Sequence, residues 1–334
     1  MKIIVDGMGG DNAPVEIVKG AIDALKEYNI DLIIVGKRHI INEELKKYDY
    51  PVDRVEVLDA EDIITNDDDP ALAIRRKKNS SIVVGMKALS NGKGDGFVSA
   101  GSTGALLAGG QLIVKRIEGI DRAALTSVYP TSMGLSLLVD AGANTDSKPE
   151  YLQQFALMGS IYMEKVMGVT KPRVGLANIG TEEGKGNELA KTSYDLMKNL
   201  DINFIGNIEG RTMPLGVADV IVADGFVGNM ILKVTEGVAI SLFKELKEVF
   251  MTNSKTKIGA LLLKSNLKFL KGKLDYTEYG GAPLLGTKKP IVKAHGSSNA
   301  YAYKNAINQA LKFIEKDVIK TIEENINLNR QILN

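Results

Sequence analysis

The segment GFVSAGSTGA, residues 96–105, joins a short apolar strand to the start of a helix through a glycine-rich turn. Similar apolar runs recur along the chain and alternate with helical patterns; they lie at residues 2–5, 32–35, 54–57, 96–99, 135–139, 173–177, 202–206 and 219–223. Strands that are apolar at nearly every position are typical of a parallel sheet with both faces covered. The alternation therefore predicts an α/β fold with a mainly parallel sheet covered by helices on both faces.

Two long helices and one insertion are predicted from the spacing of the apolar residues. Residues 14–28 have Pro14 in the first turn and an apolar face, and residues 301–323 show the same period as one continuous helix. Residues 235–275 break the alternation of strands and helices and look wholly helical. We therefore expect residues 1–334 to form a single large α/β unit with a protruding helical insertion at 235–275.

The composition is that of an ordinary globular protein of 334 residues, with 44% hydrophobic residues, 25% charged residues and a net charge of +1. A dedicated nucleic-acid-binding protein usually carries an excess of basic residues, so we expect no nucleic-acid partner. The absence of cysteine excludes a disulfide scaffold, a cysteine nucleophile and a cysteine-ligated metal, and it fits a reducing cytosol.

Two apolar segments fall short of what a targeting signal or a membrane span requires. The apolar run at the N-terminus covers only residues 3–5, which is too short for a signal peptide. Residues 96–114 are uncharged, but polar residues and five glycines interrupt them, which favours a strand, a loop and a helix. We therefore expect a cytoplasmic chain that does not cross a membrane.

Glycine-rich segments follow several predicted strands, and ligands of such sheets bind beyond the carboxyl ends of the strands. Glycine lets backbone N–H groups approach a ligand, and a helix N-terminus favours an anion. Each segment also fits a tight turn that needs glycine anyway, and neither a GxGxxG fingerprint nor a P-loop is present. The candidate phosphate- and substrate-binding residues are Gly9, Gly10, Asp11, Ser99, Gly101, Ser102, Thr103, Gly104, Asn178, Gly186, Asn187, Asp224, Gly225, Ser297 and Ser298.

Three residues are candidates for catalysis. His295 follows an apolar run and precedes small polar residues, which suits proton transfer or donation to an oxyanion; a histidine held by backbone carbonyls fits equally well. Lys185 lies between two glycines, where a cation can meet a phosphate, and the alternative is a solvated lysine on a loop. Asn229 either caps a helix or contacts a ligand.

The predicted insertion contains a basic amphipathic segment at residues 254–273, with six lysines and no acidic residue. A lysine stripe beside a wide apolar face is typical of a helix lying in an anionic membrane interface. The residues expected at this membrane tip are Ile258, Leu261, Leu262, Lys264, Lys268 and Phe269. A dimer-packing or core helix is the alternative, and Gly259 and Asn266 are positions where the segment could turn.

Taken in order, the motifs of this chain resemble those of PlsX, a family of bacterial phosphate acyltransferases. The motifs lie at residues 1–14, 75–81, 99–110, 178–187, 207–211, 216–233, 279–285 and 293–299. The resemblance implies transfer of a fatty acyl group from the thioester of acyl carrier protein to inorganic phosphate, giving acyl phosphate for phospholipid (phosphatidic acid) synthesis. It also implies a fold like that of phosphotransacetylase and of the isocitrate/isopropylmalate dehydrogenases.

The same resemblance implies a homodimer at an anionic membrane surface and a membrane glycerol-phosphate acyltransferase as the next enzyme. Phosphate is itself the nucleophile in this reaction, so we expect no activated serine or cysteine, no metal and no other cofactor. The protein must desolvate phosphate, align it with the thioester carbonyl and stabilise an oxyanion. Residues 101–104 and Lys185 would hold phosphate, and His295 with Asn229 or Ser297 would donate to the oxyanion or accept a proton.

Two other functions stay open at this point. Residues 295–299 resemble the HGSAPD-type loop of nicotinamide-dependent β-decarboxylating dehydrogenases, but the following aspartate is missing and no paired-aspartate metal site is evident. Hydride transfer is therefore disfavoured. A non-catalytic membrane scaffold would bind the carrier protein and liposomes without any phosphate-dependent release of the carrier thiol.

Overall fold

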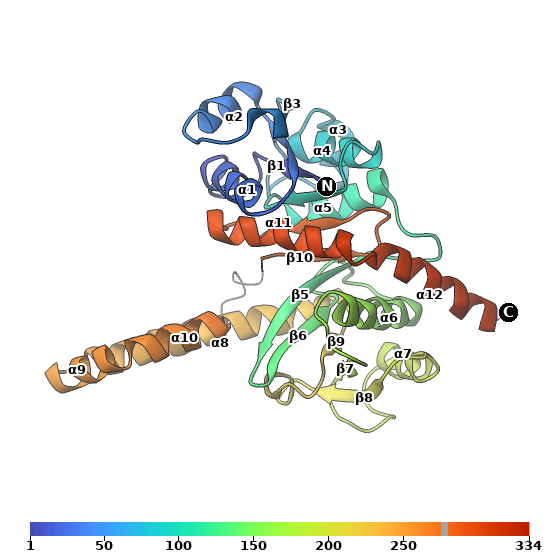
Figure 1. The fold of residues 1–334 in the computed structure, drawn as a ribbon. Helices are drawn as coiled ribbons and strands as arrows, with labels where there is room; N and C mark the ends of the chain where they lie inside the picture. Colours follow the sequence, from blue (N-terminus) through green and yellow to red (C-terminus); the bar gives the residue numbers. More distant parts are fainter. Residues whose placement is uncertain (275–279, 334) are drawn as a thin grey trace.

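The structure, a computed structural model, describes residues 1–274 and 280–333, and it describes no side chain at positions 269, 271, 273, 274 and 329–333. Within this part the strands form one sheet in the order β3-β2-β1-β4-β11-β10-β5-β6-β9-β7-β8 (Figure 1). The strands are β1 Lys2–Asp6, β2 Asp31–Gly36, β3 Val55–Asp59, β4 Gly96–Ser99, β5 Ala124–Thr131, β6 Gly134–Val139, β7 Val174–Asn178, β8 Phe204–Glu209, β9 Val220–Val222, β10 Ala282–Leu285 and β11 Ile291–Lys293. Each predicted strand overlaps one of them, which confirms the mainly parallel sheet.

Helices cover both faces of this sheet, as predicted. Side chains of a strand alternate between faces: Ile3 and Val5 of β1 pack with α1 and α11, whereas Ile4 packs with α4 and α5. The helices are α1 Val15–Glu27, α2 Arg38–Leu45, α3 Pro70–Arg76, α4 Ser81–Ser90, α5 Thr103–Gly109, α6 Pro149–Lys165, α7 Glu188–Lys198, α8 Gly225–Met251, α9 Ser254–Leu262, α10 Lys264–Leu274, α11 Ala300–Glu315 and α12 Val318–Leu333.

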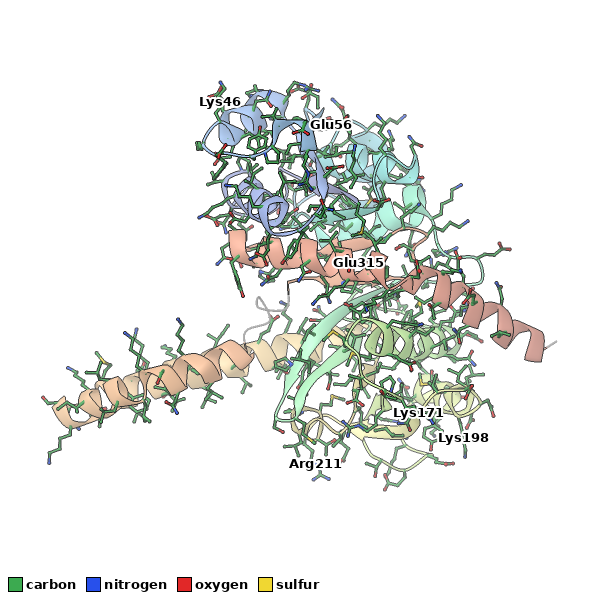
Figure 2. The ribbon with its side chains drawn as sticks, in the orientation of Figure 1. Lys46, Glu56, Lys171, Lys198, Arg211 and Glu315 are labelled. Carbon is green, nitrogen blue, oxygen red and sulfur yellow. The ribbon has the colours of Figure 1, made fainter. Side chains whose placement is uncertain are left out.

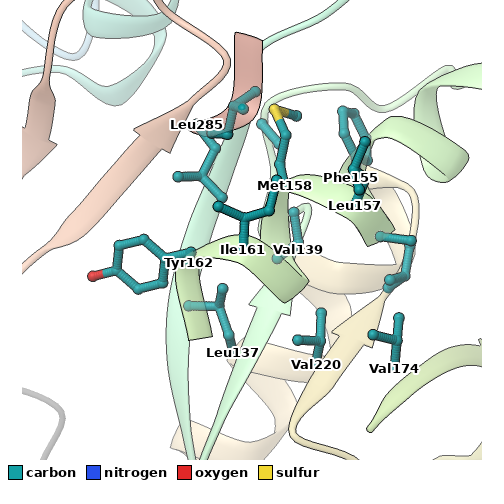
Figure 3. Packing of buried hydrophobic residues seen from close by; sticks show 14 of the residues in the cluster. Leu137, Val139, Phe155, Leu157, Met158, Ile161, Tyr162, Val174, Val220 and Leu285 are labelled. Atoms are coloured by element: carbon teal, nitrogen blue, oxygen red, sulfur yellow. The ribbon is translucent and has the colours of Figure 1, made fainter. Parts of the chain in front are cut away.

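A second part of the core lies between α6 and the strands β6, β7 and β9 (Figure 3). Met158 and Tyr162 of α6 are fully buried against Val139 and Val220. The hydroxyl of Tyr162 accepts a hydrogen bond from the side-chain amide of Gln309 on α11, which satisfies a polar group that would otherwise be costly to bury. This contact ties α11 to α6 across the middle of the sheet.

Two strands, β5 and β10, were not predicted, and both are antiparallel to their neighbours. In β5 the polar residues Thr126 and Ser127 and the proline Pro130 interrupt the apolar run, and β10 contains Pro283. A strand that contains proline and polar residues does not appear as a continuous apolar run in the sequence. These two strands join the half of the sheet around β1 to the half around β6.

The prediction of one helix over residues 301–323 is wrong. The structure has α11 and α12 instead, separated at Lys316 and Asp317. Asp317 has φ of +48°, a left-handed conformation that stops an α-helix. The apolar period continues across this break because Phe313 at the end of α11 and Val318 at the start of α12 pack in the same core cluster, so the period alone could not locate it.

The predicted insertion is helical, but its boundaries differ. The first helix, α8, starts at Gly225 rather than at residue 235, and α9 and α10 follow it with a break at Leu263. The three helices project from the sheet as an arm with α9 at its far end (Figure 1). The lysine stripe expected on one ideal helix is therefore divided between α9 and α10. Asp275 and the motif residue Tyr279 lie outside the described residues.

Of the described helices, α8 is the one whose length and apolar composition would allow it to cross a membrane. Its C-terminal half carries Lys244, Glu245, Lys247 and Glu248, whose charges are costly in hydrocarbon. At the other end its first turns pack against the sheet and line the cavity described below.

Charged side chains are distributed over the surface rather than gathered on one face; Lys46, Lys198 and Arg211 are examples on different elements (Figure 2). Lys46 and Lys198 pair with nearby glutamates, with N–O distances of 2.6 and 3.1 Å. Exposed ion pairs of this kind contribute little to stability, because solvent and salt screen them. The apolar core clusters therefore supply most of the stability of the fold.

Candidate active site

A cavity of about 800 Å³ lies at the carboxyl ends of β1, β4 and β11. Residues 8–11 after β1, 100–104 after β4 and 293–296 at the end of β11 form one side of it. The first turns of α8 and part of β5 form the opposite side. A cavity of this size at strand ends is the usual position of a small-molecule site in α/β folds.

The three loops on the first side are packed directly on one another. Gly10 has φ of +98°, and a Cβ atom there would lie 2.8 Å from the Cβ of Ala100 and 2.9 Å from the carbonyl oxygen of Gly296. Only glycine fits that position. The backbone N–H of Asp11 donates to the Gly296 carbonyl at 2.8 Å, which fixes the first loop against the third. The predicted residues Gly9, Gly10, Asp11, Gly101, Ser102, Thr103 and Gly104 all line the cavity.

Lys293, the last residue of β11, supplies a cation that the sequence analysis did not single out. Its ammonium group donates to the carbonyl of Ala100 at 3.2 Å and to that of Ala294, and its side chain lines the cavity. Burial lowers the pKa of Lys293 to about 8, against the opposing negative charges of Asp6 and Asp11. A half-buried ammonium with carbonyl partners on one side and a cavity on the other is suited to bind an anion.

His295 and Ser298 face the same cavity from the loop after β11. The imidazole Nδ1 lies 2.8 Å from the hydroxyl of Ser297, which orients the ring. Partial burial and the positive charge of Lys293 lower the pKa of His295, so the imidazole is neutral near pH 7. The hydroxyl of Ser298 is buried and has no hydrogen-bond partner among the described residues, although Ser298 lines the cavity. An orphaned buried hydroxyl at this position is available to a ligand.

The N-terminal part of α8 contributes one helical face to the opposite wall of the cavity. Asn229, Leu232, Lys233 and Glu236 follow the i, i+3, i+4, i+7 spacing of a single face, and all four line the cavity. Asn229 is therefore a wall residue rather than a cap. Asp224 is the cap instead: its carboxylate accepts from the backbone N–H groups of Phe226 and Val227 at 2.9 and 3.0 Å.

Three other predicted residues have structural contacts near the cavity without lining it. Gly225 packs on the backbone of Asn144, where a Cβ atom would lie 2.7 Å from its nitrogen. Ser99 is fully buried below the loop that follows β4, and Ser297 acts on the ring of His295. These residues shape the wall of the site.

The loop around Lys185 lies elsewhere. Asn178 donates to the carbonyl of Lys185 at 3.1 Å, Gly186 has φ of +92° beside Asn178, and Asn187 caps α7 through the N–H of Ala190. The tight-turn interpretation accounts for these contacts, and none of the predicted residues on this loop lines the cavity. A phosphate-binding role for Lys185 stays a prediction.

Comparison with known proteins agrees with the order of the motifs. A family model described as "Fatty acid synthesis protein" matches residues 1–321. The phosphate acyltransferase of Alkaliphilus oremlandii is 56% identical over 326 residues, which cover 98% of this chain and 97% of that protein. The phosphate acyltransferase of Clostridioides difficile is 51% identical over 325 residues, covering 97% and 96%. The chain belongs to this family. The family predicted from the motifs is thus confirmed.

Solved structures share the fold at low sequence identity. The phosphotransacetylase of Streptococcus pyogenes is 17% identical, with a TM-score of 0.64 and coverage of 94% of each chain. The 4-hydroxythreonine-4-phosphate dehydrogenase of Klebsiella pneumoniae is 14% identical, with a TM-score of 0.52 and coverage of 94% of this chain and 99% of that one. These likenesses concern the fold alone. Membership of the phosphate acyltransferase family, not the fold, argues against the dehydrogenase alternative.

Proposed function

We propose that this chain transfers a fatty acyl group from the thioester of an acyl carrier protein to inorganic phosphate, which gives acyl phosphate for phospholipid synthesis. The observation that carries the mechanism is the convergence of Lys293 with two glycine loops, residues 8–11 and 100–104, on one cavity. In the reaction a phosphate oxygen attacks the thioester carbonyl carbon, a C–O bond forms and the C–S bond breaks. The carrier leaves as a thiolate and takes up a proton.

Each side of the cavity has a distinct task in this mechanism. The backbone N–H groups of residues 102–104 and the ammonium of Lys293 bind phosphate and replace its water. The neutral imidazole of His295 donates to the developing oxyanion or accepts the phosphate proton, and its partner Ser297 holds the ring. Asn229 on α8 and the orphaned hydroxyl of Ser298 are further donors toward the carbonyl oxygen.

The acyl chain would occupy the apolar part of the same cavity. Leu107 lies one helical turn after Thr103 on α5, and Leu232 lies between Asn229 and Glu236 on the facing wall. Leu125 and Val128 of β5 line the cavity between them. Leu107 and Leu125 pack against one core cluster and Leu232 packs against another, so an acyl chain would extend a surface that is already apolar.

The proposal is tested by incubating the protein with a long-chain acyl carrier protein, with and without phosphate, and measuring free carrier thiol and acyl phosphate. We expect thiol release only with phosphate, and one acyl phosphate for each thiol. Carrier binding without any release would support the scaffold alternative instead. Thiol release at the same rate without phosphate would identify a thioesterase, and reduction of NAD with a 2-hydroxy acid would restore the dehydrogenase alternative.

We also propose a homodimer formed through the apolar face of α8. Val234, Val238 and Leu242 follow the i, i+4, i+8 spacing of one helical face and are 56%, 61% and 53% exposed, which is a large exposed apolar surface for one helix. A second copy of the same helix would cover this surface and leave the cavity wall on the other side of α8 in place. Sedimentation equilibrium should give twice the mass of the chain, and Val234→Glu with Val238→Glu should give the monomer.

The tip of the arm is proposed to bind an anionic membrane, so that a cytoplasmic enzyme is held peripherally near a membrane glycerol-phosphate acyltransferase. Ile258, Leu261 and Leu262 are 61%, 70% and 77% exposed, and Lys264 and Lys268 are exposed beside them. The side chain of Phe269 lies outside the described residues. Exposed leucines next to lysines favour the boundary between lipid head groups and acyl chains.

Leu261→Glu together with Leu262→Glu should abolish most sedimentation with anionic liposomes. Two buried leucines contribute about 3 kcal/mol to such binding, and the added carboxylates are repelled by anionic lipid. Turnover with soluble carrier protein should stay within about twofold of the unchanged protein, because these residues do not line the cavity. Val52→Glu, a 72% exposed position on another element, is the matched control. Unchanged sedimentation of the double variant would favour the dimer-packing alternative.

A further inference from the structure

Asp6 is a fully buried carboxylate that lies beneath the cavity without lining it. It is the last residue of β1, which pairs with β2 on one side and β4 on the other. Its Oδ2 accepts from the hydroxyl of Ser99 at 2.6 Å, and its Oδ1 accepts from the backbone N–H of Met8 at 3.2 Å. Burial raises the pKa of Asp6, and the hydrogen bonds from Ser99 and Met8 and the positive charge of Lys293 oppose that rise and favour the carboxylate.

These hydrogen bonds connect the two glycine loops of the site. Met8 starts the loop after β1, while the hydroxyl of Ser99 also accepts from the backbone N–H of Gly101 at 3.0 Å, in the loop after β4. The chain of contacts therefore runs from Met8 through Asp6 and Ser99 to Gly101. Each loop supplies backbone atoms to the cavity, and a single carboxylate lies between them.

The packing around the carboxylate is equally close. A Cβ atom at Gly9 would lie 2.4 Å from Oδ2 of Asp6 and 2.7 Å from the backbone nitrogen of Gly101. A Cβ atom at Gly101 would lie 3.2 Å from the same Oδ2. Both loops thus lie close to the carboxylate, so its position influences the distance between them.

The charge of Asp6 also acts on Lys293. Three titratable groups face the ammonium of Lys293: Asp6 at the end of β1, Asp11 in the loop after β1, and His295 in the loop after β11. Lys233 and Glu236 of α8 face His295. Burial disfavours the ammonium, and the negative charges of Asp6 and Asp11 oppose that effect. Without Asp6 the lysine would lose its proton at lower pH.

We propose that Asp6 is a positioning residue for phosphate: its carboxylate fixes the spacing of the loops at residues 8–11 and 100–104 and keeps Lys293 charged beneath the bound anion. The inference rests on the proposed function, because it assigns the anion as the phosphate of that reaction. Asp6 does not touch phosphate itself. It acts through Ser99, the loop amides and Lys293.

The test compares Asp6→Asn and Ser99→Ala with Glu44→Gln, a buried carboxylate of α2 that does not line the cavity. Asn keeps the shape of Asp but removes the charge. For Asp6→Asn we expect the KM for phosphate to rise about 10-fold with little change in the KM for acyl carrier protein. We also expect the alkaline limb of kcat/KM for phosphate to move to lower pH.

Ser99→Ala separates the two roles, because it cuts the link between the loops and leaves the charge of Asp6 in place. It should raise the KM for phosphate while the alkaline limb stays where it is. Glu44→Gln should change neither quantity. Phosphate binding measured by ³¹P NMR and calorimetry gives a readout that does not need turnover, and circular dichroism checks that each variant is folded.

The proposal is overturned if folded Asp6→Asn binds phosphate as tightly as the unchanged protein and keeps its alkaline limb. If Asp6→Asn does not fold, Ser99→Ala decides the question instead. A folded Ser99→Ala variant with an unchanged KM for phosphate would also overturn the proposal. An unchanged protein that binds phosphate but forms no acyl phosphate would instead contradict the proposed function. That outcome would leave the positioning role of Asp6 measurable by binding alone.

Discussion

Lys293→Met should lower kcat/KM for phosphate by about 10²- to 10³-fold, the usual effect of removing one charge-stabilising donor from an active site. Methionine keeps the length and apolar stem of the side chain, so the fall in kcat/KM measures the contribution of the ammonium group. Lys293 is the cation whose carbonyl partners, Ala100 and Ala294, hold it at the junction of two cavity loops. Steady-state kinetics at varied phosphate concentration measure the effect.

The pH dependence of kcat/KM for phosphate follows from the ionisation of Lys293. The pKa of Lys293 is lowered to about 8, so the ammonium is present below that pH and is lost as the pH rises through it. For the unchanged protein kcat/KM for phosphate should therefore fall above about pH 8, and Lys293→Met should lack this limb. Loss of the lysine charge should also raise the pKa of His295, which NMR titration can follow.

The matched control for this prediction is Lys289→Met, an exposed lysine close by in the sequence that does not line the cavity. It should keep turnover within about twofold of the unchanged protein. If Lys293→Met also stays within about threefold, the phosphate is held elsewhere, and the loop of Lys185 becomes the next candidate.

Much of the fold was open to prediction because parallel strands are buried on both faces and so appear as apolar runs. The strands around β1 and β6 followed from this pattern, whereas β5, with Thr126 and Pro130, did not. Thr126 is fully buried even though it is polar, because its hydroxyl donates to the carbonyl of Pro283. Such a partner is distant in the sequence, and no local pattern indicates it.

The site was predictable to the extent that glycine loops at strand ends point to it. Gly101–Gly104 and His295 follow that rule, and the structure brings them together. Lys185 also lies in a glycine-containing loop after a strand, but the carboxyl end of that strand, β7, lies outside the cavity. Lys293 was missed because a lysine at a strand end looks like any solvated lysine; its position directly before Ala294 and His295, after an apolar run, is the signal that could have found it.

Gly228→Ala should lower the free energy of unfolding by about 3 kcal/mol or more and remove most activity. A Cβ atom at Gly228 would lie 1.8 Å from the carbonyl oxygen of Asp140, so backbone must move to admit even one methyl group. Gly228 directly precedes Asn229, and a shift of this turn displaces the cavity wall formed by α8. Urea denaturation and steady-state kinetics measure the two effects.

Gly237→Ala on the same helix is the matched control, because among the described residues no atom outside the adjoining helix backbone lies within 4 Å of the Cβ that it adds. Alanine favours a helix interior over glycine by up to about 1 kcal/mol, so this variant should be as stable as the unchanged protein or more so. The two substitutions should change the free energy of unfolding in opposite directions, which separates the effect of close packing from that of helix propensity. Equal stability of Gly228→Ala and Gly237→Ala would mean that α8 does not pack on Asp140 as described, and the wall that carries Asn229 and Lys233 would need to be placed differently.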